Sequence, residues 1–441
     1  MAETTYSTTE APITHADFEF VEASGGIEAY RLMSNDLQVL LLPEAAAPVV
    51  TFMVTYRVGS RNETAGLTGA THFLEHLMFK GTERFHERHG TAIFNVLQRV
   101  GAQINATTWM DRTNYYELLP KEHLPLAVEI EADRMRGALI DADDLESERT
   151  VILNEFDRGQ NEPIRNLYHA VWSAAFVAHP YHHPTIGWRS DIETVTAEGL
   201  RHFYDRYYWP DNATVSIIGD IDREEALDLV AEHFGGITKS PDPVTPRLTR
   251  EPEQRGERRI TVRKAGQLGA VMVAYKSPEG AHPDAEALDL LAMVLASGKN
   301  SRLFRRLTDH QLTAQISASS SRLRDPGLFY ILGILAPGRT HDEVEAAIEE
   351  AIAEVQADGI TEDELQRAKN QLRAQEAFER DGPFAIASQL NEAIAAGDWK
   401  LYTTFRERIE AVTTGDVQRV AQSYLVADRC TIGRYVPVNE A

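Results

Sequence analysis

The sequence predicts an α+β protein made of two similar halves in tandem, and three observations support this fold class. The chain has 441 residues, a length that favours two or three domains. Strands, a helix, a strand pair, long helices and a closing strand are expected in that order, twice over. A stretch rich in proline and charge, residues 239–257, separates the two copies. We therefore expect a flexible arm at 1–20, a first domain at 21–238, a linker at 239–257 and a second domain at 258–441.

The first half begins with apolar or alternating segments and then contains several amphipathic segments. Period-two alternation or short apolar runs predict strands, and longer segments with helical periodicity predict helices. Strands are expected at 36–42, 49–58, 101–108, 113–119 and 213–218. Helices are expected around His72 and at 90–100, 121–136, 142–160, 161–177, 196–208 and 222–234.

The second half repeats this order after the linker. Strands are expected at 259–263, 271–275, 313–321, 327–335 and 430–435, and helices at 283–297, 340–357, 361–378, 384–396, 399–411 and 414–424. Residues 140–145 and 360–365 also have similar sequences, each just before a long helix. The repeated order and this local similarity indicate an ancient duplication.

Composition excludes several classes of function. The formal net charge of −23 argues against a nucleic-acid-binding protein, because phosphate contacts require a basic surface. The single cysteine, Cys430, excludes an intrachain disulfide and a cysteine-rich zinc module. The polar segment Met1 to Ser7 lacks the apolar core of a signal peptide, and no apolar run is long enough to span a membrane. We expect a cytoplasmic protein without membrane contact; a periplasmic protein whose signal peptide was removed is the alternative.

The strongest chemical motif is His72-Phe-Leu-Glu75-His76. On a helix, two histidines four residues apart lie on one face, one turn apart, so both imidazoles can reach the same metal ion. The order His-x-x-Glu-His is the signature of the inverted zinc peptidases. An accidental histidine pair is the alternative, but unpaired polar groups are costly among the apolar neighbours of this motif.

A catalytic zinc ion needs a third protein ligand. The expected helix 142–160 contains Glu148 and Glu155, seven residues apart and therefore on one face, flanked by apolar Val151 and Ile152. Two solvated glutamates on a charged helix are the alternative. The histidines of the segment 179–184 could suggest a second metal site, although a proline-bounded loop between helices is the simpler interpretation.

These motifs resemble the pitrilysin-type zinc peptidases, in particular the mitochondrial processing peptidases and their short bacterial relatives. The resemblance extends over roughly residues 25–435. Its motifs are His72-x-x-Glu75-His76, Phe79-Lys80-Gly81-Thr82, Glu148-Arg-Thr-Val-Ile-Leu-Asn-Glu155, Gly59-Ser60-Arg61, Asn105-Ala106-Thr107, Thr113-x-Tyr115, His179-Pro180-Tyr181, Gly187-Trp188 and Tyr208-x-Pro210-x-Asn212. The resemblance implies two similar domains in tandem, each a mainly antiparallel sheet packed with helices, and a dimer that closes like a clamshell over a peptide.

The resemblance also assigns roles by position. His72, His76 and Glu155 would hold one zinc ion per chain. Glu75 would be the general base that acts on a zinc-activated water, and Glu148 a carboxylate that supports the site. The segment Asn105-Ala106-Thr107 would be an exposed sheet edge that pairs with extended substrate; an ordinary edge strand is the alternative. Matching the two halves places His72, Glu75, His76 and Glu155 opposite Asp289, Ala292, Met293 and Gln375, so only the first half would hold metal.

The chain departs from the family at one point. Where active members or their partner subunits carry an arginine and a tyrosine seven residues apart, this sequence has Thr308 and Gln315. Neither can replace a guanidinium fork or a phenol. We therefore expect a zinc-dependent endopeptidase subunit that pairs with a homologous subunit carrying the Arg/Tyr pair, as a heterodimer or, alternatively, a homodimer. Other interpretations are that Arg302, Arg305 or Arg306 substitutes for the arginine, that the chain is a non-catalytic scaffold of the same fold, or that it is a metal-dependent hydrolase of another substrate.

Overall fold

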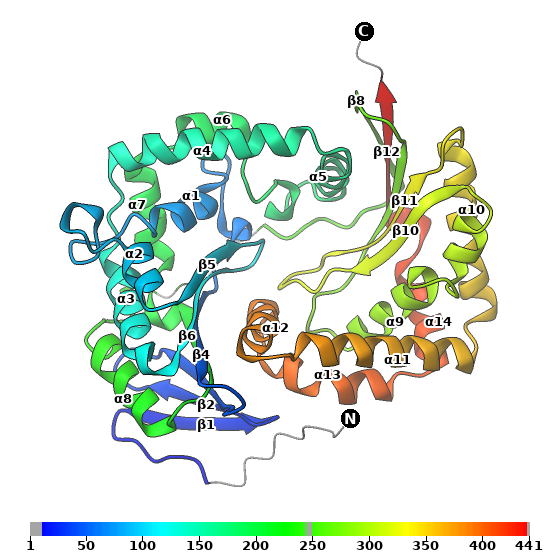
Figure 1. Ribbon diagram of the computed structural model, residues 1–441. Coiled ribbons are helices and arrows are strands. Elements are labelled where there is room, and N and C mark those ends of the chain that lie inside the picture. Colours follow the sequence, from blue (N-terminus) through cyan, green and yellow to red (C-terminus); the bar gives the residue numbers. More distant parts are fainter. Residues whose placement is uncertain (1–10, 243, 245–248, 439–441) are drawn as a thin grey trace. The chain divides into compact units, whose positions relative to one another are not determined.

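The computed structural model describes residues 11–242, 244 and 249–438 as an α+β protein with two sheets, each packed against helices (Figure 1). This confirms the predicted fold class. Close packing divides the described chain into two units. Unit 1 lies within Met1–Leu153, Thr185–Arg247 and Phe378–Thr403, and unit 2 within Asn154–Pro184, Leu248–Ala377 and Thr404–Ala441. No helix in the described ranges is both long and apolar enough to cross a membrane.

The sheet of unit 1 has seven strands: β1 (Phe18–Ser24), β2 (Ile27–Leu32), β3 (Gln38–Pro43), β4 (Val49–Tyr56), β5 (Gln103–Thr108), β6 (Thr113–Pro120) and β7 (Ala213–Gly219). Their order in the sheet is β1-β2-β3-β7-β4-β6-β5. All neighbouring pairs are antiparallel except β3 and β7. Strand β5 therefore forms one edge of this sheet.

The sheet of unit 2 has five strands: β8 (Arg258–Ala265), β9 (Ala270–Lys276), β10 (Thr313–Ser320), β11 (Leu328–Leu335) and β12 (Cys430–Val438). Their order is β10-β11-β9-β12-β8, and β8 and β12 are the one parallel pair. This order and these directions are the same as those of β5-β6-β4-β7-β3 in unit 1. The two halves of the chain thus share one strand topology.

The α-helices connect and cover these strands. In chain order they are α1 (Ala70–Leu77), α2 (Ile93–Arg99), α3 (Leu124–Gly137), α4 (Ala142–Gln160), α5 (Pro163–Ala175), α6 (Arg189–Thr194), α7 (Ala197–Tyr207), α8 (Arg223–Phe234), α9 (Ala285–Ala296), α10 (His341–Asp358), α11 (Glu362–Glu379), α12 (Pro383–Ala396), α13 (Lys400–Ala411) and α14 (Thr414–Tyr424). Most begin and end within a few residues of the predicted bounds. The short helix α6 was not predicted.

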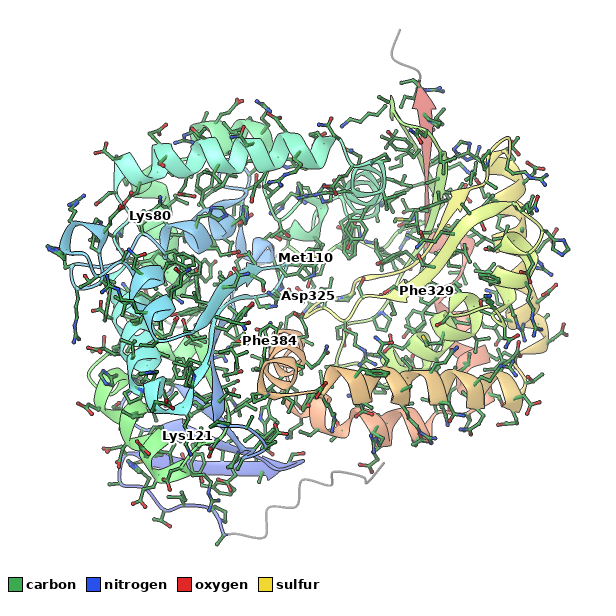
Figure 2. The ribbon with its side chains drawn as sticks, in the orientation of Figure 1. Lys80, Met110, Lys121, Asp325, Phe329 and Phe384 are labelled. Carbon is green, nitrogen blue, oxygen red and sulfur yellow. The ribbon has the colours of Figure 1, made fainter. Side chains whose placement is uncertain are left out.

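Helix α12 comes from the second half of the chain but packs on the sheet of unit 1 (Figure 1). Alternate residues of a strand face opposite sides of the sheet, and Met53 of β4 lies in one buried cluster with Ile386 and Leu390 of α12. The Phe384 ring, at the start of α12, lies 4.5 Å from the Tyr116 ring of β6, centroid to centroid (Figure 2). Burial of these apolar side chains against the sheet stabilises unit 1.

Unit 2 receives a helix from the first half of the chain in return. Helix α5 packs on β8, β9 and β12. At Gly433 of β12 a Cβ atom would lie 2.4 Å from Val171 Cγ2, so only glycine lets this helix approach so closely. The opposite face of the sheet packs on α9 and α10, and α14 packs on these two helices, around a second buried cluster that includes Val273 and Phe329 (Figure 2).

Strands β1 and β2 were not predicted, and β1 begins inside the segment 1–20 that was expected to be an arm. The Thr, Glu and Ala content of residues 1–20 led us to expect an arm, whereas buried Phe18 and exposed Glu19 begin an edge strand that pairs with β2. Residues 1–10 lie outside the described residues. The described residues of 239–257 contain no helix or strand. The units interleave along the chain, whereas the predicted domains are contiguous, so the boundaries 21–238 and 258–441 stay a prediction.

Candidate metal centre

Helix α1 has one apolar face and one face that carries the motif. Phe73, Leu74 and Leu77 are fully buried, whereas His72, Glu75 and His76 are partly exposed. The buried Glu63 carboxylate accepts hydrogen bonds from the backbone N–H groups of Gly69 and Thr71 and from the Thr71 hydroxyl. A carboxylate at a helix N-terminus satisfies N–H groups that have no partner within the helix. This cap and the apolar face fix the direction in which the motif points.

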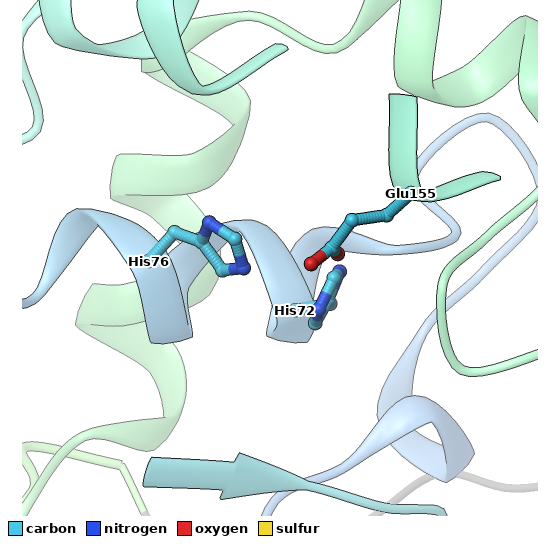
Figure 3. Close-up of side chains that lie close together, drawn as sticks. All are labelled: His72, His76 and Glu155. Atoms are coloured by element: carbon cyan, nitrogen blue, oxygen red, sulfur yellow. The ribbon is translucent and has the colours of Figure 1, made fainter. Parts of the chain in front are cut away.

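Helix α4 brings Glu155 to the two histidines. One ligand atom from each of His72, His76 and Glu155 lies within 4.8 Å of the others, and no other such group occurs in the part of the chain that the structure describes. Figure 3 shows the three side chains directed toward one another. The imidazole rings of His72 and His76 lie 4.8 Å apart, centroid to centroid. Two imidazoles and one carboxylate are a donor set that catalytic zinc uses, so the residues present fit this ion.

Glu148 lies about two turns before Glu155 on α4 and contacts both His76 and Lys80. One carboxylate oxygen lies 2.8 Å from His76 Nδ1, and the other accepts a hydrogen bond from Lys80 Nζ at 2.7 Å (Lys80 is labelled in Figure 2). The hydrogen bond with His76, followed by that from Lys80, lowers the pKa of Glu148 to about 2. The contact at Nδ1 orients the ring so that Nε2 is the nitrogen for a metal, an arrangement common among metal-bound histidines.

Of the two apolar residues expected to face inward on α4, Ile152 is buried, but Val151 is 42% exposed. Because only Ile152 packs inward, the helix presents its glutamates at the border of the core rather than within it. Lys80 was not predicted as a site residue. Its spacing of four residues from His76 was the signal that could have identified it.

A residue of the sheet contacts the Glu75 carboxylate. The hydroxyl of Thr108, the last residue of β5, donates a hydrogen bond of 2.5 Å to Glu75 Oε2. Thr108 was not predicted as a site residue either, because nothing in the local sequence links it to α1. Residues Asn105, Ala106 and Thr107 precede it on the same edge strand. Ala106 is buried, whereas Asn105 and Thr107 are exposed.

The two positions at which the chain lacks the arginine and tyrosine of the family lie in unit 2. The Thr308 hydroxyl lies 3.1 Å from that of Thr313, and Gln315 is exposed on the edge strand β10. Arg302 donates two hydrogen bonds of 2.8 Å to Glu364, and Arg306 pairs with Glu354. Arg305 donates to Asn300 Oδ1 at 3.1 Å but is exposed, whereas Arg302 and Arg306 are half-buried, so Arg305 is the most accessible of the three arginines.

The histidine-rich loop has a structural arrangement. His179 Nε2 lies 2.9 Å from a carboxylate oxygen of Asp325, and His179 Nδ1 accepts a hydrogen bond from the backbone N–H of Tyr181. The Glu251 carboxylate accepts hydrogen bonds from the backbone N–H groups of residues 177–179. These contacts fix the loop within unit 2, in agreement with the simpler interpretation of its sequence.

Comparison of the chain with known proteins identifies its family. Residues 38–187 match the family described as "Insulinase (Peptidase family M16)", and residues 194–372 match the "Peptidase M16 inactive domain". The chain is 31% identical over 400 residues to "Zinc protease PqqE" of Helicobacter pylori, covering 89% of each chain. It is 24% identical over 419 residues to the "Probable mitochondrial-processing peptidase subunit beta, mitochondrial" of Arabidopsis thaliana, covering 92% of this chain and 78% of that one.

A solved structure shows the same fold. "The crystal structure of a protease from Helicobacter pylori" superposes with a TM-score of 0.88 at 30% identity and covers 93% of this chain and 99% of that chain. The protein therefore belongs to peptidase family M16, and the predicted pitrilysin-type family is confirmed. Several of the matched relatives are named zinc proteases, which supports a metallopeptidase at the level of the family.

Proposed function

We propose that this chain is a zinc-dependent endopeptidase, or the metal-bearing subunit of one, that hydrolyses unstructured peptides. The observation that carries the proposal is the convergence of Glu155 of α4 with His72 and His76, which share one face of α1 with Glu75. When bound, zinc supplies a Lewis acid that lowers the pKa of a coordinated water toward about 7. A scaffold protein would have no use for a carboxylate next to such a cluster.

The chain's own residues would divide the remaining work. Glu75, one residue before His76, would accept a proton from the attacking water and pass it to the leaving amine, as a general base and then a general acid. Glu148 would orient the His76 ring and balance the positive charge of Lys80. The backbone of Asn105, Ala106 and Thr107 on the edge strand β5 would pair with extended substrate, with main-chain hydrogen bonds giving affinity.

A second subunit would complete the apparatus. Thr308 and Gln315 cannot supply the guanidinium and phenol that the family uses beside the substrate. The relative from Arabidopsis thaliana is itself named as a probable subunit of a processing peptidase, which supports assembly with a homologous chain. Purified alone, this chain is expected to bind zinc and to cleave slowly, and a homologue with Arg and Tyr at these positions is expected to restore the rate.

The test is hydrolysis of fluorogenic unstructured peptides by the chain with its homologous partner, compared with Glu75→Gln at equal zinc content. Loss of a proton-transfer group is expected to lower kcat by about 10²–10⁴-fold while zinc stays bound. Equal rates for the two proteins, or no cleavage by either with the partner present, would contradict the proposal and favour the scaffold. Full activity of the lone chain would contradict only the need for a partner.

A further inference from the structure

We propose that Thr108 is a positioning residue that holds the Glu75 carboxylate in its working orientation. The inference rests on the proposed function, because it assigns to Thr108 a role in the same site. A glutamate side chain has three rotatable bonds, and a general base must be held close to its productive geometry to act efficiently. The Thr108 hydroxyl donates to Oε2 at 2.5 Å, which directs Oε1 to the other side of the carboxylate.

The sheet fixes the position of Thr108. It is the last residue of β5 and lies opposite Thr113 in the register of β6. The Thr113 hydroxyl in turn donates to the carbonyl of Val58 at 3.0 Å. Helix α1 packs against β5 on the face where Ala106 is buried, and Thr108, two residues further on, shares that face. The hydroxyl therefore points from a rigid strand to the motif helix.

The turn that follows Thr108 is also held in place. The backbone N–H groups of Ser60 and Arg61 donate to the carbonyls of Trp109 and Met110, at 3.2 and 2.8 Å (Met110 is labelled in Figure 2). A Cβ atom on Gly59 would lie 2.3 Å from the Trp109 carbonyl oxygen, so this approach requires glycine. The Gly59-Ser60-Arg61 segment thereby fixes the turn after Thr108, and with it the position of the hydroxyl that holds Glu75.

The neighbouring threonine does not share this role. The Thr107 hydroxyl donates to Asn114 Oδ1 at 2.6 Å, and Arg112 donates to the Thr107 carbonyl at 3.1 Å. Thr107 points away from α1 because successive residues of a strand face opposite sides. The edge strand thus has two functions by alternation: its exposed residues lie where substrate would pair, and Thr108 restrains the base.

Thr108→Val keeps the shape and removes the donor, and Thr108→Ser keeps the donor. With the partner present, Thr108→Val is expected to lower kcat by about 10–100-fold with KM within about twofold, and Thr108→Ser to retain kcat within about threefold. Zinc affinity, measured by competition with a chelator, is expected to be unchanged in both. Thr340→Val is a matched control, because the Thr340 hydroxyl donates to Glu343 at 2.7 Å in a helix cap of unit 2. It is expected to lower stability and leave kcat and KM unchanged.

A second measurement does not depend on activity. In the metal-free chain, the urea midpoints of Thr108→Val, Glu75→Ala and the double variant are expected to be non-additive, because the two single changes remove the same hydrogen bond. Additive midpoints, or a Thr108→Val enzyme with the wild-type kcat, would overturn the inference. If the wild-type complex and Glu75→Gln are equally inactive while the midpoints are non-additive, the proposed function fails and the contact stands.

Discussion

The two halves of the chain share a strand topology but differ in what stands at the position of the motif. In unit 1, α1 follows β4 and presents His72, Glu75 and His76 on one face. In unit 2, α9 follows β9 in the same place, and the match of the two halves in sequence puts Asp289 opposite His72. The carboxylate of Asp289 pairs with Arg322, which also contacts Glu286, and Glu286 pairs with Arg408.

The same strand topology can therefore carry either a candidate metal site or a network of paired charges. In unit 2 each carboxylate near the start of α9 is matched by a guanidinium, so the buried charges are compensated. The counterparts of the other site residues, Ala292, Met293 and Gln375, offer no strong ligand for zinc. In the first half of the chain, His72 and His76 of α1 converge instead with Glu155 of α4. The duplicated fold therefore positions the site, and a few side chains decide whether it can bind metal.

The largest expected effect is on the free energy of unfolding, and it comes from α12, the helix of the second half that packs on the sheet of unit 1. Leu390 of α12 is fully buried against the sheet of unit 1. Leu390→Ala is expected to lower the free energy of unfolding by about 2–5 kcal/mol, because it removes packed atoms and leaves a cavity. Urea denaturation of the full chain measures this change. Phe378→Ala is the control, since Phe378 is 81% exposed and is expected to change stability by less than about 0.5 kcal/mol. Equal midpoints for the two variants would show that α12 does not stabilise unit 1.

The next largest effect is expected on zinc affinity, and it depends on the contact between Glu148 of α4 and the His76 ring. Glu148→Gln removes the charged acceptor shared by His76 and Lys80, and it is expected to weaken zinc binding about 10–100-fold. Competition with a chromophoric chelator measures the affinity. Glu146→Gln, on the same helix but paired with Arg149 at the surface, serves as the control and is expected to bind zinc like the wild type. Unchanged affinity in Glu148→Gln would mean that His76 needs no such support.

The smallest effect is expected at Lys276, which ends β9 in unit 2 much as Arg57 follows β4 in unit 1. Arg57 follows β4 and donates to the Asp211 carbonyl at 2.8 Å and to the Thr214 hydroxyl at 2.9 Å. Lys276, the last residue of β9, lies with its Nζ 3.1 Å from the centroid of the Phe176 ring, and this buried Nζ has no hydrogen-bond partner among the described residues. Burial lowers the pKa of Lys276 to about 7.

The sign of the pH effect follows from proton binding. Between pH 7 and the ordinary lysine value near 10.5, the unfolded chain holds a proton that the folded chain lacks, so stability rises with pH. Lys276→Met removes this proton. Between pH 7 and 9, the wild type is expected to gain roughly 1–2 kcal/mol more stability than the variant. The same gain in both proteins would show that Lys276 is charged in the folded state at pH 9.

Local patterns in the sequence predicted the fold class and the histidine pair, and the resemblance to a known family added Glu155 as the third ligand. Helical spacing placed His72 and His76 on one face, and the seven-residue interval did the same for Glu148 and Glu155. The exchange of α5 and α12 was not predicted, because nothing local shows which sheet a helix will cover. The almost uncharged sequence of α12 is typical of a buried helix but does not specify the sheet on which the helix packs. The contact of Thr108 with Glu75 depends in the same way on two segments that are distant in the sequence.

The count of zinc ions per chain tests the central contrast most directly. Elemental analysis of the purified protein is expected to give one zinc per chain, which falls to near zero in Glu155→Ala and stays at one in Asp289→Asn. These results would assign the metal to the motif in the first half of the chain and none to its counterpart in the second half. A wild-type protein without zinc after loading, or one whose zinc is retained in Glu155→Ala and lost in Asp289→Asn, would contradict the account.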